Sequence, residues 1–132
     1  LRRAVLTGED AYRRRAEDAL RSFAAVMRED VFSTAALANA LDLAIGLIEV
    51  VLLTPPGTDP EPLRRVVFEA TDPRIVLFEA ESTDGLPIDH PARGKVAVSG
   101  QPTVWVCRTG ACSLPQTEPA PLRALLQTGR QV

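Results

Sequence analysis

The chain has little of what most often carries chemistry or crosses membranes. Its 132 residues include two cysteines, one histidine and one tryptophan, and two cysteines are too few for a disulfide scaffold. No apolar run approaches the roughly 20 residues that span a bilayer, and the opening residues lack the apolar core of a signal peptide. With 15 cationic and 17 acidic residues, there is no basic field for nucleic acid. We therefore expect a cytoplasmic protein that binds neither nucleic acid nor a membrane.

The remaining composition is that of an ordinary globular domain, with 45% apolar and 24% charged residues. This length allows one core, or one core with a helical attachment. Residues 1–6 have the pattern of the last turns of a helix, which Gly8 would end in a left-handed conformation. Because the first residue is leucine rather than methionine, we expect a piece of a longer polypeptide. A processed precursor or a removed tag is the alternative.

The first third of the chain predicts two helices. Residues 10–29 carry an apolar stripe at helical spacing, formed by Tyr12, Ala16, Leu20, Phe23 and Met27. Residues 34–45 form a second helix whose polar side chains beyond its cap are only Asn39 and Asp42. A helix that is apolar almost all round is normally buried among several neighbours, which one partner helix cannot supply. We expect the rest of a longer polypeptide, or self-association through helix 34–45, to cover it.

The second part of the chain predicts an α/β domain. A strand at 47–53, a helix at 60–70 and a strand at 74–78 form a βαβ unit. Residues 81–91 indicate a loop, residues 95–98 a short strand or an extended edge, residues 103–107 a further strand, and a last helix runs from about 117 to Gly129. The fold class is therefore α/β: a helical hairpin over 1–46, then a small domain over 47–132 with a three- to four-stranded, mainly parallel sheet and flanking helices.

Cys107 and Cys112 are the redox candidates. Four residues separate them, whereas a redox pair usually has two intervening residues at the start of a helix. They would come within disulfide range if residues 108–111 fold back as a hairpin-like turn. Three interpretations remain open for this pair: plain structural cysteines, a reversible disulfide, or metal ligands completed by groups from elsewhere.

Other polar residues give weaker signals. His90, in a loop, could act as a general base, but a surface histidine is the simpler interpretation. Ser113 lacks the surroundings of a nucleophilic serine. The turn Thr54-Pro-Pro-Gly57 follows a strand and precedes a helix, but its prolines lack the N–H groups that would hold an anion. We therefore expect no catalytic residue, no metal site and no cofactor in this chain.

Several segments, taken in order, resemble the C-terminal end of thioredoxin-domain-containing proteins of the spermatogenesis-associated type. They are LTGEDAY (6–12) with AE (16–17), LDLA (41–44), IEVVL (48–52) and PTVWVCRTGACSLP (102–115). The last one looks like the closing signature of that family, which Cys107, Cys112 and Pro115 match. Thr54 departs from the pattern of that family, in which a glycine is expected after the strand at 47–53. The resemblance covers most of this chain but only the tail of a much longer protein.

The resemblance implies an N-terminal thioredoxin-like domain and a central α/α toroid of helical hairpins, similar to sugar epimerases and six-hairpin glycosidases. Residues 1–46 would then be the last hairpin of the toroid and residues 47–132 an α/β appendage. The thioredoxin-like motif has no counterpart here, so the resemblance transfers no catalytic role. We expect a non-catalytic structural or interaction module of a larger protein. The alternatives are a part of a carbohydrate-active enzyme whose site lies elsewhere, and a redox module using Cys107 and Cys112.

Overall fold

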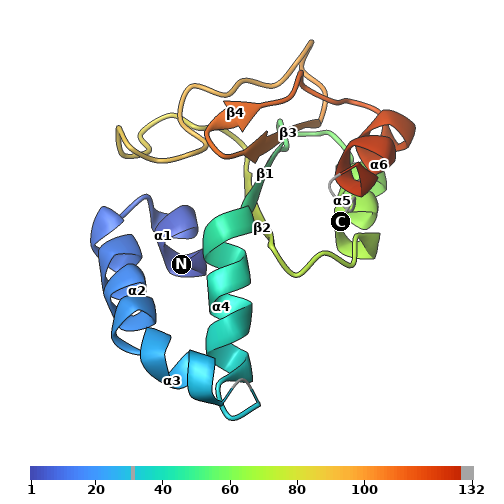
Figure 1. Cartoon of the computed structure of the whole chain (residues 1–132). Coiled ribbons are helices and arrows are strands. Elements are labelled where there is room, and N and C mark those ends of the chain that lie inside the picture. Colours follow the sequence, from blue (N-terminus) through green and yellow to red (C-terminus); the bar gives the residue numbers. More distant parts are fainter. Residues whose placement is uncertain (31, 129–132) are drawn as a thin grey trace.

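The computed structural model describes residues 1–30 and 32–128, which form a helical part and a sheet part (Figure 1). The helical part contains α1 (Arg2–Thr7), α2 (Asp10–Ser22), α3 (Ala24–Glu29) and α4 (Ala35–Gly46). The sheet part contains β1 (Ile48–Leu53), α5 (Glu61–Glu69), β2 (Ile75–Ala80), β3 (Thr103–Arg108), β4 (Ala111–Cys112) and α6 (Pro119–Gln127). The α/β class and the helical N-terminal part are thus confirmed.

The four strands lie in the order β2-β1-β3-β4. Only the β1–β2 pair is parallel, whereas β1–β3 and β3–β4 are antiparallel, so the prediction of a mainly parallel sheet is wrong. The direction of β3 has a simple cause. The connection from β2 enters β3 at Thr103, which lies opposite Leu53 at the end of β1. Since this connection never crosses to the other end of the sheet, β3 has to run back along β1.

The two faces of the sheet are covered differently. On the helix-covered face, Ile48, Val50 and Leu52 of β1 pack against α5 and α6. The alternate residues Val51 and Leu53 face the other side, where the long connection over residues 81–102 covers them. We call this side the loop-covered face. The unbroken apolar run of β1 therefore reflects burial on both faces, as predicted, but not parallel neighbours on both edges.

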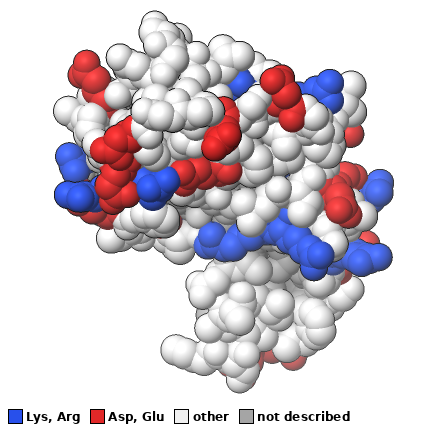
Figure 2. Space-filling view, turned by 180° about the vertical axis from the view of Figure 1, so that it is seen from behind, with Lys and Arg blue, Asp and Glu red and all other residues white. Residues whose placement is uncertain are grey.

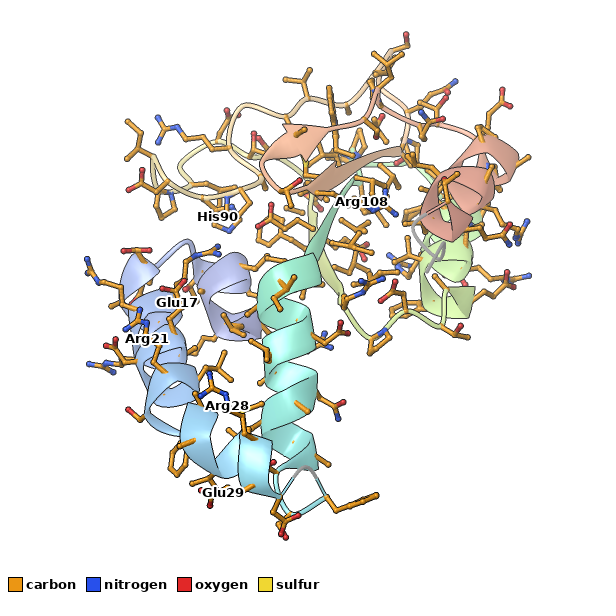
Figure 3. The ribbon with its side chains drawn as sticks, in the orientation of Figure 1. Glu17, Arg21, Arg28, Glu29, His90 and Arg108 are labelled. Atoms are coloured by element: carbon orange, nitrogen blue, oxygen red, sulfur yellow. A yellow bond between two sulfur atoms is a disulfide. The ribbon has the colours of Figure 1, made fainter. Side chains whose placement is uncertain are left out.

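His90 attaches the long connection to α1, and the expectation of a surface histidine is wrong because its side chain is only 4% exposed. The backbone N–H of Ala92 donates to its Nδ1 over 3.0 Å, and its Nε2 lies 3.3 Å from the carbonyl oxygen of Leu6. Since Nδ1 accepts a hydrogen bond, Nε2 carries the proton and donates to Leu6. The ring also packs on Phe78, with 4.6 Å between ring centroids, and Figure 3 shows it between the connection and α1.

Several predicted boundaries shift by a few residues. The helix expected over 10–29 is interrupted at Phe23, which separates α2 from α3. Residues 95–98 form no strand, because the antiparallel neighbour of β3 on its outer side is β4. The predicted end of the last helix at Gly129 lies outside the described residues. Gly8 ends α1 with a φ of 72°, as its sequence position predicts.

The Gly8 position tests the contact between α1 and the connection. A Cβ atom at Gly8 would lie 3.1 Å from the Cα and Cβ atoms of His90, whereas one at Gly57, also at positive φ, would meet nothing within 4 Å. We expect Gly57→Ala to lower the free energy of unfolding by about 1 kcal/mol for its left-handed backbone, and Gly8→Ala to lower it by about 1 kcal/mol more through overpacking. Urea unfolding of both variants measures the difference. An equal loss of stability in the two variants would show that His90 moves aside without a measurable energetic cost.

Candidate functional site

The two cysteines lie at the tip of a short hairpin. Thr109 and Gly110 join β3 to β4 with φ values of 48° and 81°, and positive φ at both positions characterises the type I′ turn that suits a two-residue hairpin. The turn places Cys107 directly opposite Cys112, with their Cα atoms 3.9 Å apart and their sulfurs joined in a disulfide. The prediction that a turn over 108–111 would bring the cysteines into disulfide range is confirmed.

The two sulfur-bearing residues have different environments. Cys107 is 3% exposed and lies on the loop-covered face, because it alternates with Val106 along β3. Cys112 is exposed, as are Thr109, Gly110 and Ala111 before it. Because β4 is the last strand in the order of the sheet, solvent reaches the disulfide from the side of Cys112.

A carboxylate lies next to the buried cysteine. Glu49 of β1 is half-buried and stands opposite Cys107 on one side and Val76 on the other, so all three side chains share the loop-covered face. Lys95 approaches from the long connection, where its Nζ donates to the carbonyl oxygen of Pro91. Burial lowers the pKa of the Lys95 ammonium group, and the attraction of Glu49 opposes this shift.

The hairpin turn also borders a cleft of about 330 Å³ beside the helical part. Its walls come from α2, the end of α4, the start of β1 and the turn itself. The lining residues are Arg13, Ala44, Ile45, Leu47, Glu49, Thr109 and Gly110. The fold thus brings the disulfide hairpin and the apolar helix, which are far apart in the sequence, to two sides of one cleft.

The face of α4 is the second candidate site. Leu43 is the buried residue of α4, whereas Leu41 is 40% and Ile45 is 71% exposed. These two residues are four positions apart and therefore share one side of the helix. Within residues 10–29, all of which the structure describes, neither α2 nor α3 has a buried residue. Figure 2 shows few charged side chains on the lower part of the molecule, which α2, α3 and α4 form in Figure 1.

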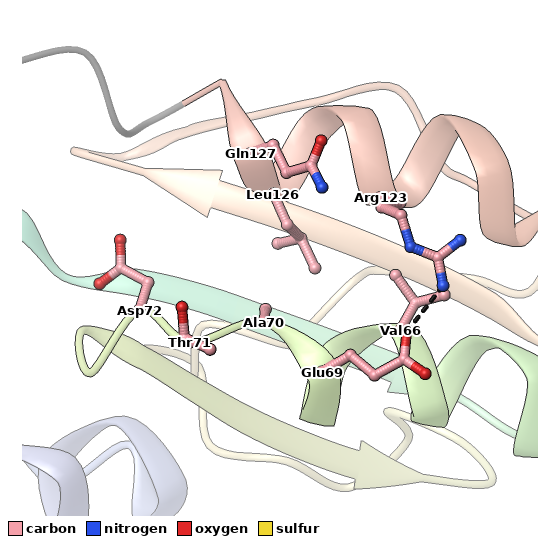
Figure 4. A pocket seen from close by; sticks show the side chains of 8 residues that line it. All are labelled: Val66, Glu69, Ala70, Thr71, Asp72, Arg123, Leu126 and Gln127. Carbon is pink, nitrogen blue, oxygen red and sulfur yellow. Dashed lines mark hydrogen bonds and ion pairs between the residues drawn. The ribbon is translucent and has the colours of Figure 1, made fainter.

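A smaller hollow of about 160 Å³ lies between α5 and α6 (Figure 4). The charges around it are paired: Arg123 contacts Glu69 over 2.7 Å, and the Asp72 carboxylate accepts hydrogen bonds from the side chain of Arg74 at 2.7 and 2.9 Å. These bonds hold the pKa of Asp72 below its usual range. The arrangement stabilises the fold, and the described residues around the hollow present no free acid or base to a ligand.

Sequence reasoning missed two residues near the hairpin. Arg108 follows Val104 and Val106 on the helix-covered face; its Nη2 donates to the carbonyl oxygen of Leu125 over 3.2 Å, and its Nε is buried without a hydrogen-bond partner among the described residues. Its sequence position two residues after Val106 places Arg108 on the apolar face of the strand, and this pattern could have identified it. Glu49, which interrupts an apolar strand, gave the same kind of signal.

Comparisons with known protein families, with curated proteins and with solved structures find no match for this chain. Across residues 1–30 and 32–128, no cluster of three or more His, Cys, Asp or Glu side chains is placed to hold a metal ion. In the same part of the chain, every helix is too short or too polar to cross a membrane. The two candidate sites therefore have to be interpreted from their own geometry.

The hairpin turn gives one prediction. Thr109 is β-branched and has a left-handed φ of 48°, which is costly for such a residue, whereas asparagine before glycine is favoured in this turn. We expect Thr109→Asn to raise the free energy of unfolding of the oxidised chain by about 0.5–1 kcal/mol, measured by urea unfolding. Thr117→Asn, the same change outside the positive-φ positions, should give no gain. A destabilised Thr109→Asn chain would contradict the proposed strain.

The Asp72–Arg74 pair predicts an effect of pH. Because the pKa of Asp72 is lower in the folded chain, its stabilisation is complete above the unfolded value of about 3.9 and is lost as the pH falls through the folded value. We expect Asp72→Asn to lower the free energy of unfolding by about 1–3 kcal/mol at pH 7, and the difference from wild type to shrink near pH 2. Urea unfolding across this pH range measures it. The exposed Asp89 supplies the control Asp89→Asn, and a pH-independent difference at Asp72 would contradict the assignment.

Proposed function

We propose that this chain is a non-catalytic structural module that packs against further helices of a larger assembly through the face of α4 that carries Leu41 and Ile45. The carrying observation is that α4 is apolar beyond the side that it buries: Leu43 packs into a core cluster with Val5 and Val76. A surface helix normally turns its apolar side toward the core and its polar side toward solvent. Here, the strongly apolar residues Leu41 and Ile45 remain exposed.

The polar residues of α4 border a cleft within the chain. Asn39 and Asp42 line a cleft between α4 and the start of β2, together with Arg2 and Arg74. The carboxylate of Asp42 lies 4.0 Å from Nε of Arg74. Both polar residues remain exposed at the edge of this cleft, and the exposed Leu41 and Ile45 are left for a neighbour to cover.

The family resemblance supports a particular occupant. In a toroid of helical hairpins, the helices of adjacent hairpins pack against one another, and residues 1–46 resemble the last hairpin of such a ring. We propose that helices of that longer polypeptide cover α4, and that the assembly is cytoplasmic. If the longer protein acts on a carbohydrate, its site lies outside this chain, and the packing role proposed here is unchanged.

In the isolated chain, the helices available to cover α4 are those of a second copy. We therefore expect the purified chain to dimerise in a concentration-dependent manner and to bind a hydrophobic dye as a monomer, measured by light scattering and dye fluorescence. Ile45→Glu should weaken the dimer at least tenfold, since burying an isoleucine side chain contributes about 1.5–3 kcal/mol.

Ile88→Glu is the matched control, because Ile88 is 79% exposed but lies in the long connection away from α4. It should leave both readouts unchanged. A wild-type monomer that binds no dye at high concentration would overturn the proposal, because α4 would then need no cover. Equal effects of the two substitutions would point to general surface stickiness rather than to packing through α4.

A further inference from the structure

The disulfide hairpin differs from a buried structural crosslink in the access to its two sulfurs. Cys112 is exposed on the edge strand β4, and the residues before it, Thr109, Gly110 and Ala111, are small and exposed as well. Cys107 is buried, on the loop-covered face of the sheet. Of the two cysteines, Cys112 is therefore the one that a nucleophile from solvent meets first.

We propose that the Cys107–Cys112 pair is a thiol–disulfide exchange site whose partner is a dithiol reductant. This inference rests on the hairpin alone and is independent of the packing role of α4.

The proposed reaction has two balanced steps. A thiolate of the dithiol attacks Sγ of Cys112, a mixed disulfide forms, and the bond to Sγ of Cys107 breaks. The electron pair leaves on Cys107, whose thiolate takes a proton from solvent. The second thiolate of the dithiol then attacks its own sulfur in the mixed disulfide and releases Cys112. The dithiol is oxidised to a disulfide, and the protein gains two electrons and two protons.

The hairpin remains ordered when the disulfide opens, because backbone hydrogen bonds hold the second arm of the hairpin to β3. The N–H of Ser113 donates to the carbonyl oxygen of Val106 over 2.8 Å, and Val104 and Gln116 exchange two bonds of 2.8 Å. The released thiols therefore stay within reach of each other, and the disulfide can re-form. A crosslink between residues only five apart also constrains the unfolded chain less than a long-range one, so opening it costs less stability.

Glu49 slows the departure of Cys107, and this effect can be tested. Negative charge develops on Cys107 as it leaves, and the Glu49 carboxylate opposite it in register opposes that charge. Removing the carboxylate makes Cys107 a better leaving group. We expect Glu49→Gln to speed reduction by dithiothreitol severalfold, whereas Glu118→Gln, at an exposed carboxylate before α6, should leave the rate unchanged.

The main experiment compares the two sulfurs in the folded chain. We expect dithiothreitol to release two thiols from the oxidised chain in native buffer, counted by alkylation and mass spectrometry, while circular dichroism shows an intact sheet. Two single-cysteine variants are then treated with glutathione disulfide. The Cys107→Ser chain, which keeps Cys112, should form the mixed disulfide at least tenfold faster than the Cys112→Ser chain, which keeps Cys107. Reduction only in denaturant, or a Cys107 that reacts as fast as Cys112, would overturn the proposal and leave a purely structural disulfide.

A second measurement applies if a serine variant fails to fold. The oxidised wild-type chain is treated with reduced glutathione, the reaction is stopped with acid, and peptides are mapped for the glutathione adduct. We expect the adduct on Cys112, and an adduct on Cys107 would contradict the proposed direction of attack. Neither measurement uses the oligomeric state, so a failure of the packing proposal and a failure of the exchange proposal give different results.

Discussion

The structure depends on the burial of β1 on both of its faces. Val50 and Leu52 point to one side and Val51 and Leu53 to the other, and all four are buried. α5 and α6 cover the first side, so the second needs a separate cover. That cover is an irregular connection, and an irregular segment needs fixed anchor points because it has few backbone hydrogen bonds of its own. His90 supplies one anchor through α1, and Thr83 closes the connection on itself by donating to the carbonyl oxygen of Lys95 over 3.0 Å.

This constraint also determines the edge of the sheet. Since the connection stays at the end of the sheet where β1 and β2 finish, β3 runs antiparallel to β1, and its outer side would be an open edge. Exposed strand edges favour unwanted pairing with other chains. The two-residue strand β4 and its disulfide occupy that edge. The disulfide is therefore at the boundary of the fold, where it is accessible, rather than at its centre, where it would carry the stability.

Local sequence signals located most of the elements. Helical periodicity placed the apolar helix at 34–45, shifted by one residue from α4 at Ala35–Gly46, and turn residues placed β1, α5 and β3 closely. The direction of β3 was not predictable in the same way, because a strand buried on both faces has the same apolar pattern in a parallel and in an antiparallel sheet. The burial of His90 was missed because its partners, Leu6 and Phe78, are distant in the sequence.

At the candidate site, too, the sequence predicted local features, whereas contacts between distant segments appeared only in the structure. The spacing of Cys107 and Cys112 allowed a turn that would join them, but only the register of β3 against β1 places Glu49 beside the buried sulfur. Only the fold places Thr109 and Ile45 on one cleft. A helix that packs over Ile45 would therefore lie beside the hairpin turn at Thr109 and Gly110. The packing of a partner on α4 and the surroundings of the hairpin turn are thus linked by geometry, although different residues support the two proposals. Helices of a larger assembly that cover α4 would border this turn, as would the second copy in a dimer of the isolated chain.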